Sequence, residues 1–241
     1  MFELIDAPSP NFDARTAPPS MLVLHYTGMT SGAAALARMR DPEAKVSAHY
    51  MIDEDGAVYA LVAEERRAWH AGVSFWRGTR DVNGASVGIE LVNPGHENGY
   101  RAFPDAQIDA LIALIGEIRG RWIIPDHNIV GHSDVAPERK QDPGELFPWA
   151  RLHQAGHGVW VAPQVAPGGA LHEGDEGVGV FALQAGLNRL GYESPPSGQF
   201  DAHTRALVTA FQRHWRPEVC DGAADGETRA TLMAVLRAAA E

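Results

Sequence analysis

Two stretches of this sequence carry side chains that could bind a metal ion. His25 stands at the end of the apolar run Met21–Tyr26, and a later block, 131–144, contains His132 and Asp142. Neutral imidazole and carboxylate are ligands that zinc accepts, and a catalytic zinc needs three protein ligands and one open position. The two stretches lie far apart and contain no short ligand pair. On this pattern alone, each of the 11 histidines could equally be a packed core or surface residue.

The single cysteine limits the residue types that could form a metal site. Cys220 lies in the C-terminal region and cannot form a disulfide within the chain. A closed zinc site built from several thiolates is therefore excluded, and any metal ligands must be histidines and carboxylates.

The residues around these candidates show the patterns of strands and helices. The runs Met21–Tyr26 and Ser86–Val92 are apolar and short, as strands are, and residues 53–56 separate two further runs as a hairpin turn would. After Pro104, one apolar face with helical spacing predicts a helix that ends at Gly120; this face consists of Ile108, Leu111, Ile112 and Ile115. Strands and helices together predict an α/β domain over residues 1–155.

The last third of the chain has a different pattern. Residues 156–172 are rich in Pro and Gly and are interpreted as a linker. Residues 173–241 contain three short amphipathic patterns, which predict a small three-helix bundle. An internal repeat places Asp201 and Asp225 at equivalent positions, where each suits the N-cap of a helix.

Composition limits the classes of ligand. With 20 Lys and Arg against 31 Asp and Glu, the net charge is −11, which disfavours nucleic acid and anionic membranes as partners. No apolar stretch is long enough to span a bilayer, and no obligate protein partner is indicated. The first residues, 1–8, lack the basic and apolar regions of a signal peptide, so we expect a cytoplasmic location, or a periplasmic one if the start is misassigned or a signal was removed.

Five sequence blocks, in order, resemble one enzyme family. They are Leu24–Thr27, Val46–Asp53, Arg67–Gly72, Ser86–Leu91 and Gly131–Gly144. They are similar to the zinc-dependent N-acetylmuramoyl-L-alanine amidases of the AmpD/AmiD type, which are related to T7 lysozyme and the peptidoglycan recognition proteins. The resemblance implies an α/β fold with a central mixed β-sheet flanked by helices.

The same resemblance implies the site residues. One Zn2+ would be held by His25, His132 and Asp142, and Glu90 and Lys140 would be catalytic. A carboxylate near zinc can take the proton of water and pass it to the leaving amine, and an ammonium can stabilise the developing oxyanion. Strand alternation places Glu90 on the face opposite Val87, Ile89 and Leu91, so its carboxylate can point into a cleft.

Other residues in the matching blocks suit substrate contact. Trp69 offers an aromatic face, and His70 and Asn83 offer hydrogen bonds that could orient a muropeptide. Packing and support of the metal site are equally compatible with these three residues. Asp134 could be a turn residue or could orient the ring of His132.

Residues 173–241 resemble the peptidoglycan-binding domain found after many wall hydrolases. Such a domain would either bind glycan, which raises the local substrate concentration, or only pack against the amidase. The predicted function is hydrolysis of the amide between N-acetylmuramic acid, as its 1,6-anhydro form, and L-alanine during peptidoglycan recycling. The alternatives are a periplasmic amidase that acts on intact sacculus and a non-catalytic muropeptide-binding protein.

Overall fold

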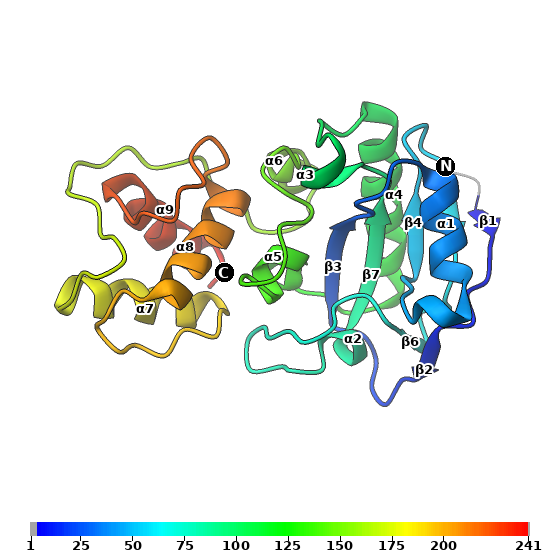
Figure 1. Ribbon diagram of the computed structural model, residues 1–241, viewed down its shortest axis with the longest axis horizontal. Helices are drawn as coiled ribbons and strands as arrows, with labels where there is room; N and C mark the ends of the chain where they lie inside the picture. The colour runs from blue at the N-terminus through cyan, green and yellow to red at the C-terminus, as the bar shows by residue number, and fades with distance from the viewer. Residues whose placement is uncertain (1–3, 241) are drawn as a thin grey trace.

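The computed structural model describes residues 4–240 and contains an α/β part and a smaller helical part (Figure 1). The α/β part is built on a six-stranded sheet with the strand order β1-β5-β4-β7-β3-β8. A separate two-stranded antiparallel sheet pairs β2 with β6. The strands are β1 (Leu4–Asp6), β2 (Phe12–Ala14), β3 (Met21–Tyr26), β4 (Tyr50–Ile52), β5 (Val58–Ala60), β6 (Arg66–Ala68), β7 (Ser86–Leu91) and β8 (Ile129–Gly131).

The main sheet is mixed, as predicted. Strand β3 runs parallel to both β7 and β8, whereas β4 and β5 are antiparallel and form the predicted hairpin. In the hairpin turn the Gly56 N–H donates to the Asp53 carbonyl at 2.9 Å, and Gly56 takes a φ of 88° that favours glycine. The two strands that carry the predicted site residues, β3 and β7, are central and lie side by side.

Helices cover both faces of this sheet (Figure 1). Helix α4 packs against one face through Ile108, Leu111 and Ile115, which are fully buried with the apolar residues of β3 and β7. A second cluster places Ala35 and Met39 of α1 against Met51. The helices of this part are α1 (Gly32–Arg40), η1 (Pro42–Ala44), α2 (Val82–Ala85), α3 (Gly95–Asn98), α4 (Asp105–Arg121), η2 (Asp126–Asn128), α5 (His132–Val135) and α6 (Trp149–Gln154).

The end of α4 differs from the prediction. The helix continues through Gly120 to Arg121, and the Trp122 N–H donates to the Ile118 carbonyl at 2.9 Å. A glycine inside a helix costs only about 1 kcal/mol, whereas Ile118 is fully buried against the sheet. Gly120 does not take the left-handed φ of a helix-ending glycine, so the helix continues through it by one residue.

The helical part consists of α7 (Val178–Leu190), α8 (Ala202–Trp215) and α9 (Gly226–Ala238). The repeated aspartates are helix N-caps: Asp201 accepts from the Thr204 N–H and Asp225 from the Thr228 N–H. Between Gln154 and Val178, a stretch that the structure describes throughout, no helix or strand forms apart from isolated bridge residues.

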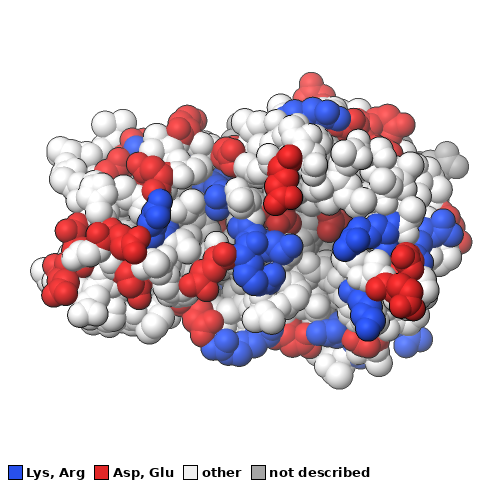
Figure 2. Space-filling view, in the orientation of Figure 1, with Lys and Arg blue, Asp and Glu red and all other residues white. Residues whose placement is uncertain are grey.

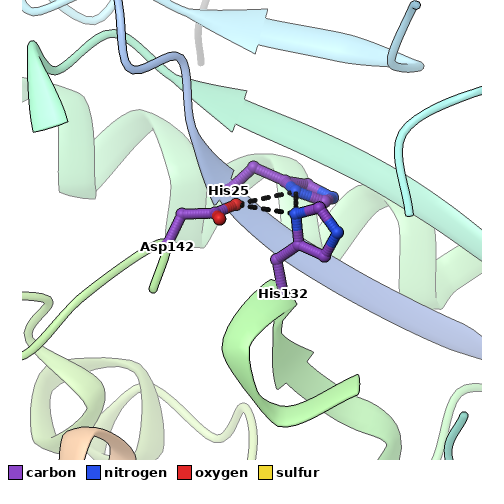
Figure 3. Close-up of side chains that lie close together, drawn as sticks. All are labelled: His25, His132 and Asp142. Carbon is purple, nitrogen blue, oxygen red and sulfur yellow. Dashed lines mark hydrogen bonds and ion pairs between the residues drawn. The ribbon is translucent and has the colours of Figure 1, made fainter. Parts of the chain in front are cut away.

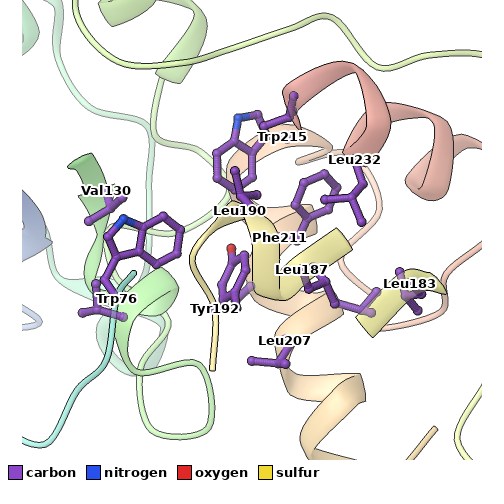
Figure 4. Close-up of a cluster of buried hydrophobic side chains, with 14 of the residues drawn as sticks. Trp76, Val130, Leu183, Leu187, Leu190, Tyr192, Leu207, Phe211, Trp215 and Leu232 are labelled. Atoms are coloured by element: carbon purple, nitrogen blue, oxygen red, sulfur yellow. The ribbon is translucent and has the colours of Figure 1, made fainter. Parts of the chain in front are cut away.

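The two parts share one apolar core (Figure 4). Trp76, Val130 and Val135 of the α/β part lie in the same buried cluster as Tyr192 and Phe211 of the helical part. The ring of Trp76 meets that of Tyr192 edge-on, with 5.1 Å between the ring centroids. Within residues 4–240, no helix has the length and apolar character needed to cross a membrane.

Candidate metal centre

Three buried side chains converge at the carboxyl end of β3 (Figure 3). His25 Nδ1 and His132 Nδ1 lie 2.9 Å apart, and each is 3.0 Å from Asp142 Oδ2. Ligand atoms around a tetrahedral zinc ion are separated by about 3.3 Å, as follows from its bond lengths. The structure therefore brings together the three predicted ligands at a spacing close to what a metal ion requires.

Each ligand comes from a different element of the fold. His25 ends the central strand β3, His132 begins the short helix α5 directly after β8, and Asp142 lies in the loop that follows α5. The Ser133 N–H donates to the Asp142 carbonyl at 2.8 Å, which ties that loop to α5. Parallel pairing of β3 with β8 thus makes neighbours of residues that are far apart in the sequence.

The outer nitrogens of both imidazoles are held by hydrogen bonds. His25 Nε2 lies 3.0 Å from His70 Nδ1, and His132 Nε2 lies 3.1 Å from the Ala71 carbonyl oxygen. An N–H on Nε2 that donates to these acceptors leaves Nδ1 with a free lone pair, and both Nδ1 atoms face Asp142. This donor set fits a divalent ion such as zinc.

Burial and hydrogen bonds shift the pKa values of two of the candidate ligands, His25 and Asp142. Burial lowers the pKa of His25 to about 4, so its imidazole is neutral at physiological pH. Burial alone would raise the pKa of Asp142, but the charges and hydrogen bonds of His132 and His25 outweigh that effect and hold this pKa well below its usual range. A neutral His25 imidazole and an ionised Asp142 carboxylate are in the protonation states that metal binding needs.

Glu90 lies beside this cluster on the neighbouring strand. It is paired in register with His25 across β3 and β7, and Val87, Ile89 and Leu91 point to the opposite face, as predicted. Its Oε2 atom is buried and has no hydrogen-bond partner among residues 4–240. Burial, and then the nearby charge of Asp142, raise the pKa of Glu90 well above its usual range. A carboxyl with a raised pKa in a cleft suits proton transfer.

A cavity of about 370 Å³ opens onto these groups. His132, Asp142, Glu90 and Lys140 all line it, so the structure brings the predicted catalytic residues to one space. His96 also lines this cavity and was not predicted from the sequence. Its Nδ1 lies 2.9 Å from the Tyr26 hydroxyl, and its Nε2 lies 3.1 Å from Glu145 Oε2. No local sequence motif predicts this position of His96, because its two partners lie far away in the sequence.

Two of the three residues predicted to contact substrate lie outside the cavity lining. Trp69 donates its indole N–H to Asp13 at 2.7 Å and is not among the residues that line the cavity. Asn83 is also outside the lining; its side-chain oxygen accepts the backbone N–H groups of His70 and Ala71. Asn83 thus supports the loop behind the candidate metal ligands, and substrate contact by Trp69 and Asn83 stays a prediction.

His70 reaches the cavity wall but is held mainly by the protein. Its Nε2 lies 3.3 Å from the Ser86 hydroxyl, and its Nδ1 faces His25. A Cβ atom on Gly88 would lie 2.5 Å from the ring of His70, so only glycine leaves room for it. His70 therefore supports the ligand His25 from behind.

Asp134 links the metal centre to the helical part. Its Oδ1 accepts the Tyr192 hydroxyl at 2.7 Å, and its Oδ2 lies 2.8 Å from His214 Nδ1 and accepts the Gly131 N–H. No direct bond from Asp134 to the His132 ring is present among the described residues. Asp134 instead fixes the start of α5, on which His132 stands, and both of its side-chain partners come from outside the amidase-like part.

Family profiles match both parts of the chain. Residues 15–145 match the profile described as N-acetylmuramoyl-L-alanine amidase, and residues 176–232 match that of a peptidoglycan binding domain. The amidase match contains the three candidate metal ligands, Glu90 and Lys140.

Individual relatives agree with these profiles. The N-acetylmuramoyl-L-alanine amidase AmiD of Escherichia coli is 38% identical over 90% of this chain and 82% of its own length. The 1,6-anhydro-N-acetylmuramyl-L-alanine amidase AmpD of Enterobacter cloacae is 37% identical over 62% of this chain and 90% of its own length.

Solved structures extend the similarity to the whole fold. A complex of E. coli AmiD with anhydro-N-acetylmuramic acid-L-Ala-D-gamma-Glu-L-Lys has a TM-score of 0.78 and 36% identity, covering 93% of this chain and 91% of that one. AmpDH3 from Pseudomonas aeruginosa has a TM-score of 0.77 and 33% identity, covering 92% of each chain. The profile and the fold both match, four of the five expected residues line one cavity, and His25 lies against His132 and Asp142; the chain belongs to the N-acetylmuramoyl-L-alanine amidase family.

Proposed function

We propose that this protein is a zinc-dependent amidase that cuts the bond between 1,6-anhydro-N-acetylmuramic acid and L-alanine in soluble muropeptides, as a step of peptidoglycan recycling. The observation that carries the proposal is the cluster of His25, His132 and Asp142 beside an unpartnered Glu90. The anhydro form is supported by the relatives: both AmiD and AmpDH3 have been solved with anhydromuramic peptides.

His25, His132 and Asp142 would hold the zinc ion, which supplies Lewis-acid activation of water and of the amide carbonyl. Glu90 faces the same cavity and accepts the proton that the attacking water releases. Its raised pKa means that it holds this proton firmly and can deliver it to the leaving amine of L-alanine. Lys140 places a positive charge at the cavity wall, where it stabilises the oxyanion of the tetrahedral intermediate.

The direct test is hydrolysis by the purified full chain. Anhydro-muropeptides and intact sacculi are incubated with the protein, with and without a chelator, and products are identified by mass spectrometry. We expect zinc-dependent release of the peptide from the anhydro-muropeptide and little release from sacculi. Comparable cutting of sacculi would favour an amidase of the intact wall, and binding without cutting would favour a non-catalytic receptor.

A further inference from the structure

A second hollow adjoins the metal cavity where α8 packs against the amidase part. Its volume is about 320 Å³, and it shares Arg139, Lys140 and Gln141 with the metal cavity. From the other side it is lined by Arg205 and Arg213 of α8. Figure 2 shows Lys and Arg side chains gathered near the middle of this face, beside the boundary between the two parts. We call this hollow the cationic groove.

The cations of the groove lack close carboxylate partners. Among the described residues, 4–240, no ion pair within 4.0 Å involves Arg139, Lys140 or Arg213, and Arg205 has only Glu173 at 4.0 Å. One carboxylate, Glu138, also lines the groove, but its Oε1 lies 2.9 Å from His203 Nδ1. Three cations without a carboxylate within 4.0 Å, and a fourth with one only at that limit, are unexpected in a chain with a net charge of −11.

The hydrogen bonds of Arg213 and Arg139 go to neutral groups and not to carboxylates. The Nη2 atom of Arg213 makes one long contact of 3.4 Å with Gln141 Oε1, and its Nε is buried with no acceptor in the described part of the chain. Arg139 donates only to the backbone carbonyls of Ala71 and Val73. A buried guanidinium N–H without a partner is unfavourable, so an anionic ligand that accepts from it would bind with a gain.

We propose that the cationic groove binds the carboxylates of the stem peptide, so that α8 of the helical part contributes directly to substrate recognition. This inference rests on the proposed function. The peptide in the AmiD complex contains a gamma-linked Glu, whose α-carboxylate is free. An extended peptide advances about 3.3–3.6 Å per residue, so a stem of three residues reaches from the metal cavity into a hollow that begins next to Asp142.

The chemistry of the groove suits this ligand. A guanidinium presents paired N–H groups that match a carboxylate, and such charge-assisted hydrogen bonds are stronger than neutral ones. Arg205 and Arg213 lie two helical turns apart on α8, so they can meet two separate carboxylates along one peptide. The peptide's own charge thus selects the side of the active site on which it lies.

The test compares two substrates with the wild type and R205A/R213A. One substrate is the anhydro-muropeptide with the stem L-Ala-γ-D-Glu-L-Lys, and the other carries carboxamides in place of its two carboxylates. We expect the wild type to prefer the carboxylate substrate at low salt. In R205A/R213A the ratio of kcat/KM between the two substrates should fall about tenfold, mainly through KM, because two charge-assisted contacts are lost.

The matched control is R189A/R237A, which removes the same charge from exposed positions on α7 and α9. The control should keep the wild-type ratio. A wild-type ratio in R205A/R213A would overturn the groove proposal while leaving the amidase intact. Because Arg213 is partly buried, R205Q/R213Q is measured as well, with thermal unfolding of every variant.

A binding measurement separates failure of the groove from failure of the proposed function. The free tripeptide L-Ala-γ-D-Glu-L-Lys is titrated calorimetrically into the wild type, R205A/R213A and the control. We expect about tenfold weaker binding only in R205A/R213A. If the wild type cuts neither substrate but the peptide binds with this difference, the groove stands and the hydrolytic function falls; equal binding by all three proteins overturns the groove.

Discussion

Contacts behind the two candidate histidine ligands determine which ring nitrogen faces the metal site. The His25 ring is held from behind by His70, and the His132 ring by the carbonyl of Ala71. Each contact leaves the same nitrogen, Nδ1, facing the cluster. Such outer contacts orient the ring and select its tautomer before a metal arrives.

Replacing His70 with Ala should weaken metal binding without removing a ligand. We expect about 10- to 100-fold lower zinc affinity, the usual effect of losing a hydrogen bond behind a ligand. A competition titration with a zinc chelator measures this affinity. The control is Trp69→Phe, which keeps an aromatic side chain, loses the hydrogen bond to Asp13 and lies outside the cavity lining. Unaltered zinc affinity in His70→Ala would contradict the supporting role of His70.

Glu90→Gln should abolish proton transfer while preserving the fold and the metal. The expected loss in kcat is about 10²- to 10⁴-fold, the range for removal of a general base. Zinc content by mass spectrometry should stay at one ion per chain, since Glu90 is not a ligand. Hydrolysis at the wild-type rate would remove Glu90 from the mechanism.

The same substitution should stabilise the metal-free protein at neutral pH. The folded-state pKa of Glu90 is raised, so the wild type binds a proton more tightly when folded and loses stability as pH rises from about 4.3, the ordinary value, through the folded pKa. Gln does not titrate. Denaturant unfolding should therefore show equal stability near pH 4 and an advantage for Glu90→Gln that grows as the pH is raised to 8. A constant difference across this pH range would contradict the prediction.

At the scale of secondary-structure elements, α5 joins the two parts of the chain. It begins with the ligand His132, and its Asp134 is bonded to Tyr192 after α7 and to His214 in α8. Asp134 is 1% exposed, so its two partners provide hydrogen bonds that water would otherwise give. The helical part therefore stabilises the element that carries a metal ligand.

Tyr192→Phe removes one of these bonds and nothing else. A hydrogen bond to a buried charged group contributes about 1.5–3 kcal/mol, so the free energy of unfolding should fall by that amount. Zinc affinity should fall as well, because the start of α5 becomes less well fixed. The matched control is Tyr59→Phe. The hydroxyl of Tyr59 makes no hydrogen bond within the described part of the chain, so its removal should cost little. Equal stability of the two variants would show that Asp134 does not depend on Tyr192.

Elements with a strong local pattern could be predicted from the sequence. The alternation in β7 placed Glu90 opposite three apolar residues, and the structure confirms this because one face of β7 packs on α4. The predicted end of α4 was wrong by one residue because Gly120 keeps a helical φ and does not form a left-handed cap, a choice that the sequence alone does not decide. The partners of Asp134 and His96 could not be predicted, since their contacts depend on how distant segments pack.

At the scale of the whole molecule, the shared core makes the two parts depend on one another. The buried Trp76 contacts Tyr192, and Trp160 of the connecting segment packs against both of the larger apolar clusters. AmpD, by contrast, matches 64% of this chain and 95% of its own, so the amidase fold also exists without a helical part.

Truncation to residues 1–155 should expose this shared surface. Trp76, Val130 and Val135 would lose their apolar neighbours in the helical part. Asp134 would lose its hydrogen bonds to Tyr192 and His214. We expect a lower Tm than that of the full chain and binding of a hydrophobic dye, measured alongside the full chain at the same concentration. A truncated protein with the full-chain Tm and no dye binding would contradict the structural role of the helical part.

The aromatic contacts at this boundary also give the molecule a built-in optical reporter. The imidazole of His214 stacks on the indole of Trp149 at 3.6 Å between centroids, so two parts of the chain meet ring to ring. Any ligand or variant that separates them would change the surroundings of this indole. Tryptophan emission, compared between the full chain and a Trp149→Phe variant, therefore reads out domain separation without an attached label.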